Sequence, residues 1–329
     1  MIIKSNKGRK RKFVFLVLLL IIVFMVIRWM RGCSSDEEQI WDDNLSQSTI
    51  NEITYNGQQY RYNNNLINIL YLGIDNFDII RNDMMPGDAG QTDCIMILSL
   101  NKETKQAKIL QIPRDTMTEI DIYNRSGNVF TTVTEQIATQ YAYCTGGANS
   151  CWAAKKTISE MLYDLPIDAY LAMDMASISL VNDAVGGVTI TIPKDYTMID
   201  PAFQEGAMVT LKGDQAYDYV HWRDTNASFS NNDRMERQVQ YIPAMIDTIR
   251  SNAELEGDYY DTIYPLVEKY MITDLQEDEI NELANYELSV SDIRRLPGEG
   301  KKGEVYEEFY LDEEKLQKML IETFYILKN

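Results

Sequence analysis

The chain has 329 residues, enough for one large domain or two modest ones, and its 45% of hydrophobic residues is typical of a globular protein. Its formal net charge is −19, and residues 1–31 hold eight Lys and Arg but no acid, so the rest of the chain carries −27. A body this acidic repels the phosphates of DNA and RNA, and the composition therefore argues against nucleic acid as a partner.

A basic tail over residues 1–12 precedes an apolar segment over residues 13–30. Residues 13–27 are apolar without a break, and Trp29 and Met30 make the segment long enough to span a bilayer if Arg28 reaches the interface. The cations before the span predict a cytoplasmic N-terminus and an extracellular body. A cleaved signal peptide is the alternative. Because no small-x-small cleavage site follows, we expect an uncleaved single-pass anchor in the cell membrane.

Four cysteines occur, of which Cys33 lies next to the membrane and Cys94 lies in an expected strand. Cys144 and Cys151 bracket the glycine-containing segment "CTGGANSC". Outside the cell a disulfide between them is plausible, but their spacing is equally compatible with two unpaired thiols. A zinc site is not expected, since the chain has a single histidine and no Cys-x-x-Cys.

Residues 31–65 are polar and acidic and predict an extracellular stalk, with a small hairpin turning at Asn56-Gly57. "LINILYLGID" (66–75) has the profile of a strand buried on both faces. "TDCIMILSLN" (92–101) and "QAKILQIPRD" (106–115) predict two further strands, joined as a hairpin by a tight turn.

Helices and strands are then expected in alternation. Apolar spacing predicts helices over 131–143 and 150–165, the second capped by Ser150, and over 175–185, 212–224 and 232–250, the last kinked or shortened by Pro243. Strands are expected over 167–174 and 188–193. This order predicts an α/β body with a mixed sheet covered on both faces, over residues 66–250. Residues 251–329 are expected to form a C-terminal helical extension.

Two carboxylates stand at the ends of expected strands: Asp75 ends the first, and Asp93 begins the second. If these strands are neighbours, the two carboxylates approach each other and repel unless a cation or proton intervenes, so a hard cation such as Mg²⁺ or Mn²⁺ is a reasonable ligand. The alternative is that each aspartate merely caps a loop.

Arginines are few in the expected body, yet three lie in the short segments "HWRD" and "DRMERQ". Arg234, Arg237 and Gln238 fall on one side of a helix, and their spacing suits a phosphate or pyrophosphate, which guanidinium forks bind bidentately. Salt bridges to the abundant acids are the bland alternative. No hydrolytic triad, P-loop or Gly-x-Gly-x-x-Gly accompanies them, and His221 is expected to pack or to neighbour a substrate.

Seven motifs in one order resemble the LytR-CpsA-Psr family of cell-wall proteins of Gram-positive bacteria. They are "LYLGID" (70–75), "GQTDCIMILSLN" (90–101), "IPRDT" (112–116), "QYAY…GG" (140–147), "VNDAVGGVTI" (181–190), "LKGDQAYDYVHWRD" (211–224) and "DRMERQ" (233–238). The resemblance implies an α/β/α sandwich that transfers a glycopolymer, such as teichoic acid or capsular polysaccharide, from a polyprenyl-pyrophosphate carrier to peptidoglycan.

The resemblance also assigns residues by motif. Asp75 and Asp93 would hold the metal. The pyrophosphate would be bound by Arg114, Gln91, His221, Arg223, Arg234, Arg237 and Gln238. Asp75, Asp93, Arg114 and Arg223 would be the catalytic set. Metal and guanidinium charge would then stabilise the phosphoryl oxygens, as in other phosphoryl transfers.

The chain departs from the family pattern at three cationic positions. Gln91 stands where an arginine is frequent, His221 replaces the first arginine of an Arg-x-Arg, and Gln136 replaces a lysine before "YAY". These losses favour an alternative hypothesis, a catalytically weak protein that binds polyprenyl phosphates or organises wall assembly. The retained Asp75, Asp93, Arg114 and Arg223 favour the transferase. A pyrophosphate-lipid hydrolase, with water as acceptor, is a third possibility.

Overall fold

The structure is a computed structural model that describes residues 52–76, 81–224, 226–256, 264–288 and 290–328. The expected basic tail, the expected membrane span and the first part of the expected stalk lie outside these residues. Within the described ranges, no helix is both long enough and apolar enough to cross a membrane.

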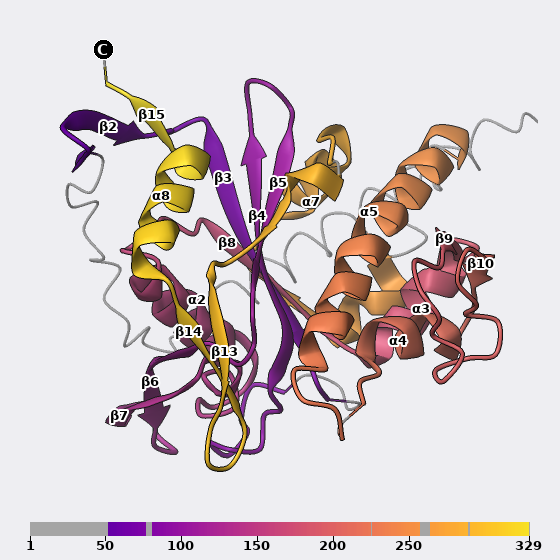
Figure 1. The fold of residues 1–329 in the computed structure, drawn as a ribbon, viewed down its shortest axis with the longest axis horizontal. Helices are drawn as coiled ribbons and strands as arrows, with labels where there is room; N and C mark the ends of the chain where they lie inside the picture. Colours follow the sequence, from indigo (N-terminus) through magenta and orange to yellow (C-terminus); the bar gives the residue numbers. More distant parts are fainter. Residues whose placement is uncertain (1–51, 77–80, 225, 257–263, 289, 329) are drawn as a thin grey trace, which may run out of the picture. The chain divides into compact units, whose positions relative to one another are not determined.

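A six-stranded mixed sheet forms the centre, in the order β11-β8-β3-β4-β5-β12 (Figure 1). The strands β3 (Leu66–Ile74), β4 (Thr92–Asn101) and β5 (Ala107–Ile112) are antiparallel neighbours and confirm the three strands expected there. β8 (Ala169–Asp174) pairs parallel with β3. The edges are β11 (Met271–Thr273), antiparallel to β8, and β12 (Ile293–Arg295), parallel to β5.

Helices cover both faces of this sheet (Figure 1). On one face, α2 (Gly147–Met161) and α8 (Glu313–Phe324) bury Ile158 and Phe324 against Leu70 and Ile97. On the other, α5 (Asn231–Glu256) packs Ile242 against the β4 and β5 side chains. This confirms the predicted α/β body with a mixed sheet. The central strands β3 and β4 are mostly apolar and buried because both faces of the sheet are covered there.

A second core lies beside α5 and holds the helix that carries the sole histidine. It is built from α3 (Ala176–Ala184), β9 (Val188–Thr191), β10 (Met208–Leu211) and α4 (Asp214–His221). Phe203 and Tyr219 meet edge to face at its centre, with ring centroids 5.3 Å apart. α5 continues past Pro243, so this proline does not shorten the helix, which was one of the two effects expected of it.

The helix expected over 131–143 is wrong. β7 (Val129–Gln136) pairs antiparallel with β6 (Met117–Tyr123), and only the short 3-10 helix η1 (Ile137–Thr139) follows. The segment is rich in β-branched Thr and Val, whose side chains suit an extended hairpin better than a helix. α2 likewise begins at Gly147, and Ser150 lies inside it, donating its hydroxyl to the Tyr141 carbonyl.

The predicted hairpin at Asn56-Gly57 is confirmed by β1 (Glu52–Tyr55) and β2 (Gln58–Tyr62). Both turn residues have positive φ, 50° and 76°, as a two-residue turn of this hand requires. The C-terminal strand β15 (Tyr325–Leu327) adds to β2 as a third strand. Part of the segment expected as a stalk is thus paired with the end of the chain.

Residues 251–329, expected to be helical, also supply strands. Besides β11, β12 and β15, they form the hairpin β13 (Gly298–Lys302) and β14 (Glu307–Leu311). Strands of three residues are too short to show the alternation that identifies a strand in a sequence. The remaining elements are α7 (Glu277–Glu282) and the 3-10 helices η2 (Glu268–Tyr270), η3 (Leu283–Asn285) and η4 (Val290–Asp292).

Candidate functional site

A bulge between β3 and β4 brings the two predicted aspartates together. Gly73 pairs with Cys94 and Ile74 with Thr92, so Asp93 is the extra residue of the bulge. A Cβ on Gly73 would lie 2.9 Å from the Cβ of Cys94, so only glycine allows this approach. The Asp75 amide donates to the Gln91 carbonyl at 2.8 Å. Both aspartates therefore lie at the same edge of the sheet.

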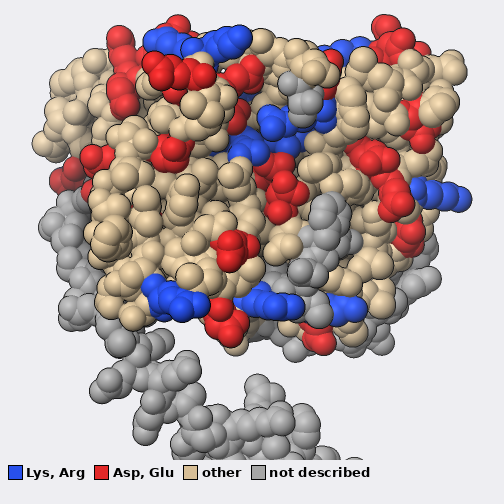
Figure 2. Space-filling model, turned by 90° about the horizontal axis from the view of Figure 1, so that it is seen from below, with Lys and Arg blue, Asp and Glu red and all other residues tan. Residues whose placement is uncertain are grey.

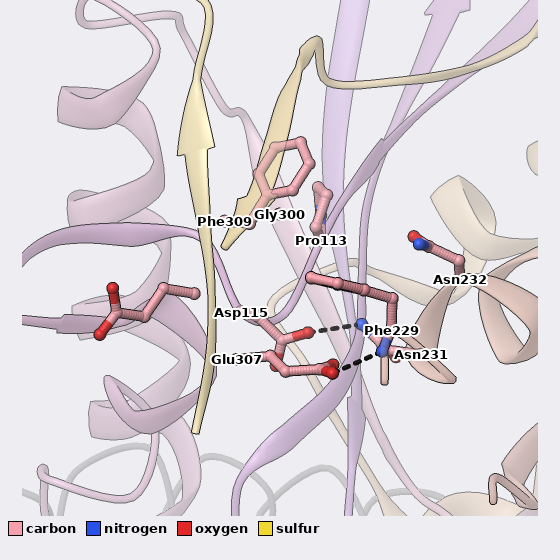
Figure 3. Close-up of a pocket in the computed structure, with 9 residues that line it drawn as sticks. Pro113, Asp115, Phe229, Asn231, Asn232, Gly300, Glu307 and Phe309 are labelled. Carbon is pink, nitrogen blue, oxygen red and sulfur yellow. Dashed lines mark hydrogen bonds between the residues drawn. The ribbon is translucent and has the colours of Figure 1, made fainter. Parts of the chain in front are cut away.

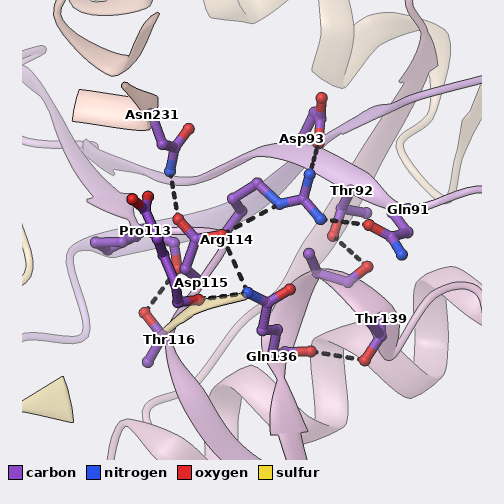
Figure 4. Close-up of polar contacts among 12 residues, drawn as sticks. Gln91, Thr92, Asp93, Pro113, Arg114, Asp115, Thr116, Gln136, Thr139 and Asn231 are labelled. Carbon is purple, nitrogen blue, oxygen red and sulfur yellow. Dashed lines mark hydrogen bonds and ion pairs between the residues drawn. The ribbon is translucent and has the colours of Figure 1, made fainter. Parts of the chain in front are cut away.

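Asp93 forms ion pairs with two arginines from distant parts of the chain. Its side chain is 4% exposed, and its two oxygens accept separately from Nη1 of Arg114 and Nη1 of Arg234. Arg114 also donates through Nη2 to the side-chain oxygen of Gln91 (Figure 4). Burial raises the pKa of Asp93, but the two guanidiniums outweigh burial and hold the pKa below its usual range. The Asp93 carboxylate is therefore ionised, and it fixes the positions of the guanidinium groups of Arg114 and Arg234.

Asp75, Asp93 and His221 form a cluster that could hold a metal ion. One ligand atom from each lies within 4.8 Å of the others, and Nε2 of His221 is 3.9 Å from Asp75 and 3.8 Å from Asp93. Burial lowers the pKa of His221, against the pull of both aspartates, so the imidazole keeps a free lone pair at neutral pH. Two carboxylates and one neutral imidazole fit a divalent cation with positions left for water and substrate.

His221 was predicted as a phosphate neighbour and not as a metal ligand. His221 is far from Asp93 in the sequence, and nothing in the segment "YVHWRD" identifies it as a metal ligand. The ring of Tyr217, one turn earlier in α4, stacks on the imidazole with centroids 4.7 Å apart. Placement of the last turn of α4 therefore decides whether the cluster forms.

Arg237 and Gln238, predicted to bind substrate, contact α4 instead. Nε of Arg237 donates to the Tyr219 carbonyl at 2.5 Å and Nη2 donates to the Trp222 carbonyl, while Gln238 donates to the Val220 carbonyl at 3.2 Å. Both side chains are buried. They satisfy the carbonyls that a helix leaves unpaired at its C-terminus, and so they position His221 and the residues after it.

Arg223 follows α4 and is exposed. Its charge contributes to the pKa shifts of Asp115, His221 and Arg234, which places it near the cluster. Figure 2 shows basic side chains directly beside acidic ones near the middle of the face seen from below. Of the predicted arginines, Arg114 and Arg234 contact Asp93, and Arg223 lies near their neighbours Asp115 and His221.

Asp115, Asn231 and Gln136 belong to the same network, and the sequence did not identify them as site residues. Asn231 donates to Asp115 at 2.9 Å and accepts from Nη2 of Arg234 at 2.7 Å. Gln136 donates to the other Asp115 oxygen at 3.3 Å (Figure 4). Burial raises the pKa of Asp115 despite the nearby Arg114. Asparagine and glutamine bridges of this kind follow no spacing rule that a sequence could reveal.

Of the two alternatives for Cys144 and Cys151, a disulfide or two unpaired thiols, the structure has the unpaired thiols. Cys144 and Cys151 are free, buried thiols. Cys144 packs with Tyr123 and Ala153, whereas Cys151 belongs to the main core beneath the sheet. The glycine-containing segment does not fold back on itself, because Gly147 already begins α2 and carries Cys151 into the helix.

Comparison with known proteins identifies relatives of this chain. The LytR_cpsA_psr family model matches residues 26–324. A curated relative from Bacillus cereus, named polyisoprenyl-teichoic acid–peptidoglycan teichoic acid transferase TagU, is 31% identical over 241 residues, 72% of this chain and 70% of its own. A relative of the same name from Halalkalibacterium halodurans is 29% identical over 68% of each chain.

Solved structures show the same fold. The crystal structure of B. subtilis TagU is 22% identical, with a TM-score of 0.54 over 78% of this chain and 95% of its own. The structure titled "TagT bound to LI-WTA" is 24% identical, with a TM-score of 0.56 over 79% of this chain and 89% of its own. The resemblance stated from the motifs is confirmed by a family model that spans nearly all of the sequence: the chain belongs to the LytR_cpsA_psr family.

Proposed function

We propose that this chain is a phosphotransferase that moves a teichoic acid or related wall glycopolymer from a polyprenyl-pyrophosphate carrier to peptidoglycan. Its curated relatives are named for teichoic acid transfer to peptidoglycan. The observation that carries the proposal is the buried Asp93 held between Arg114 and Arg234, beside a cluster fit for a divalent cation. Such a site suits phosphoryl transfer, in which positioning and charge supply most of the catalysis.

The arginines would bind the phosphoryl oxygens of the carrier. Asp93 fixes the planes of two guanidiniums before substrate arrives, so little reorganisation remains when charge develops on the phosphorus. Arg223, exposed after α4, would close on the outer oxygens. A glycan hydroxyl would then attack the phosphorus that bears the polymer: a new oxygen–phosphorus bond forms, the bond to polyprenyl phosphate breaks, and the hydroxyl proton passes to the departing polyprenyl phosphate. Arg237 and Gln238 would act indirectly, through α4.

Asp75, Asp93 and His221 would hold Mg²⁺ or Mn²⁺. When bound, such an ion supplies positive charge to the phosphoryl oxygens. Asp75, whose side chain is 42% exposed, leaves the open side of the cluster accessible to solvent and substrate.

The same proposal includes the location of the protein. A span over residues 13–30, with the basic residues 1–12 inside the cell and the segment from 31 outside, would anchor the chain in the cell membrane of a Gram-positive bacterium. The catalytic residues, all within 66–250, would then face peptidoglycan outside, in an α/β/α sandwich that the C-terminal residues complete.

The test uses the full chain in detergent micelles with a polyprenyl-pyrophosphate-linked teichoic acid oligomer, peptidoglycan fragments and Mg²⁺. We expect polyprenyl phosphate and a linked glycan, and neither when EDTA replaces Mg²⁺. Arg114→Ala should abolish turnover. Arg294→Ala is the matched control, because this arginine is half exposed on β12 and pairs with Glu322 at 3.7 Å.

Two other results would favour the alternatives. Release of phosphate-bearing products without an acceptor, at the same rate as with one, would indicate a pyrophosphate-lipid hydrolase. Tight lipid binding without any product would indicate a binding or scaffolding protein. Neutral Gln91, Gln136 and His221 at positions where the family pattern has cations are the observation that favours this second outcome.

A further inference from the structure

A pocket lies next to Arg114 and Arg234, on the side of Asp115. Asp75, Asp93 and His221, the candidate metal ligands, do not line it. Its lining includes Asp115, Phe229, Asn231, Asn232, Glu307 and Phe309 (Figure 3). These residues come from the β5–β6 turn, the start of α5 and the β13–β14 hairpin. Pro113 and Asp115 belong to the "IPRDT" motif, but the proposed carrier site does not use this pocket.

The β13–β14 hairpin is fastened over the pocket by specific contacts. The Phe309 amide donates to the Asp115 carbonyl at 2.8 Å, and the Gln136 side chain donates to the Glu307 carbonyl at 2.7 Å. The Glu307 carboxylate accepts from the Phe229 amide (Figure 3). Three segments far apart in the sequence therefore build one wall.

The ring of Phe229 is held at the pocket by its surroundings. Its backbone has a φ of 58°, a left-handed conformation that a bulky residue rarely adopts without support. Gly300 faces the ring, and a Cβ there would lie 2.7 Å from it. The absence of a side chain at Gly300 thus leaves space for the ring. Phe229 as a whole is 37% exposed.

The pocket connects directly to the arginines that would hold the carrier phosphate. Asn231 joins Asp115 to Arg234, as described above. Nε of Arg114 is buried, lies 3.6 Å from Oδ1 of Asp115 and has no hydrogen-bond acceptor among the described residues. A hydroxyl bound at Asp115 would therefore lie beside both guanidiniums.

The lining chemistry suits an uncharged saccharide. Aromatic rings pack against the C–H faces of sugars, and carboxylates accept hydrogen bonds from hydroxyls while side-chain amides both donate and accept. Three acidic residues, Asp115, Glu307 and Glu308, are among those that line the pocket, and their negative charge repels phosphate. An anionic glycopolymer is thus disfavoured here, and a neutral sugar is favoured.

We propose that this pocket is the subsite for the acceptor glycan, binding an uncharged saccharide with a hydroxyl donated to Asp115. The proposal rests on the proposed transferase function. It places donor and acceptor on opposite sides of Arg114, with positive charge toward the carrier phosphate and negative charge toward the sugar. When both substrates are held in this way, a bimolecular reaction becomes a step within a single complex.

The test measures the acceptor KM of the full chain in micelles, using the transfer assay above. Phe229→Ala should raise the acceptor KM about tenfold, with the rate at saturating acceptor and the affinity for the donor lipid unchanged. Phe130→Ala is the matched control, because Phe130 is 77% exposed on β7 and lies outside the pocket. Gly300→Ala, which displaces the ring without removing it, should raise the same KM if Phe229→Ala fails to fold.

A binding measurement separates this proposal from the proposed function. Chitotetraose, an uncharged N-acetylglucosamine oligomer, is titrated into the full chain by calorimetry without donor. It should bind the parent chain and Phe130→Ala equally, and Phe229→Ala about tenfold more weakly. An unchanged acceptor KM and chitotetraose affinity in folded Phe229→Ala would overturn the subsite, as would a glycerol phosphate oligomer that competes with chitotetraose. Absence of transfer in every variant, with chitotetraose binding as expected, would instead overturn the transferase and keep the saccharide site.

Discussion

Arg114→Lys separates the charge of the central arginine from its shape. In the structure three nitrogens of Arg114 have different neighbours: Nη1 pairs with Asp93, Nη2 donates to Gln91, and Nε lies 3.6 Å from Asp115. A lysine ammonium is a single point and can keep only one of these contacts. The net charge of the site is unchanged by this substitution. Any loss of transfer rate therefore measures the contribution of the planar guanidinium and its fixed contacts.

The expected loss is large in rate and small in stability. Removing one preorganised donor from a site that stabilises developing negative charge costs about 10²–10³ in kcat. An uncompensated buried carboxylate would cost about 3–5 kcal/mol of folding free energy, but Asp93 keeps Arg234 as a partner. We therefore expect a loss of about 1.5–3 kcal/mol, that of one hydrogen bond to a charged group.

Single-turnover transfer with saturating donor lipid measures the chemical step, and thermal unfolding of the same preparations measures stability. Arg294→Lys, on the exposed face of β12, controls for the exchange itself. A rate within about twofold of the parent, where about 10²–10³ is expected, would refute the argument that the fork of Arg114 is what the site requires. A loss of stability as large as that expected for an unpaired buried carboxylate would show that Arg234 is not sufficient to compensate the charge of Asp93.

Three further predictions follow from individual side chains. Burial raises the pKa of Asp115, so ionisation of this carboxyl opposes folding. As pH rises through that raised pKa, the free energy of unfolding of Asp115→Asn should increase relative to that of the parent. A relative decrease, measured by urea unfolding, would contradict this. Cys144 and Cys151 should react as thiols in unfolded, unreduced protein, and mass spectrometry that finds them bonded would contradict the structure. Phe324→Ala should cost about 3–5 kcal/mol, because its buried ring completes the main core. Ile326→Ala, at a residue 37% exposed, should cost far less in the same unfolding assay.

The central strands and the main arginines could be predicted because their signals are local. Leu66–Ile74 and Thr92–Asn101 are long apolar runs, and such runs survive without any knowledge of their partners. Asp75, Asp93 and Arg114 stand where these runs end, and ends of neighbouring strands meet at one edge of the sheet. Helical spacing singled out the arginines of α5 as a candidate phosphate site, and the motif resemblance then linked them to Asp93.

The remaining parts depend on contacts between distant residues. The bulge at Asp93 arises from pairing and is invisible in either strand alone. β11 and β12 are three residues each and exist because the sheet offers them an edge. Arg237 was predicted to bind phosphate because it shares a helix face with Arg234. Its position one turn later meets the end of α4 instead, where backbone carbonyls take its donors.

The charge balance of the site explains how it could work without the missing cations. Arg114, Arg223 and Arg234 are opposed by Asp75, Asp93 and Asp115, and burial keeps His221 neutral by lowering its pKa. The side chains alone therefore leave little net positive charge for an anionic pyrophosphate. An arginine at position 221 would add charge but could not bind a metal, whereas an imidazole can. Histidine at this position thus offers a metal ligand in place of a fixed charge, and under the proposed function the divalent cation that Asp75, Asp93 and His221 would hold would supply the positive charge for the pyrophosphate.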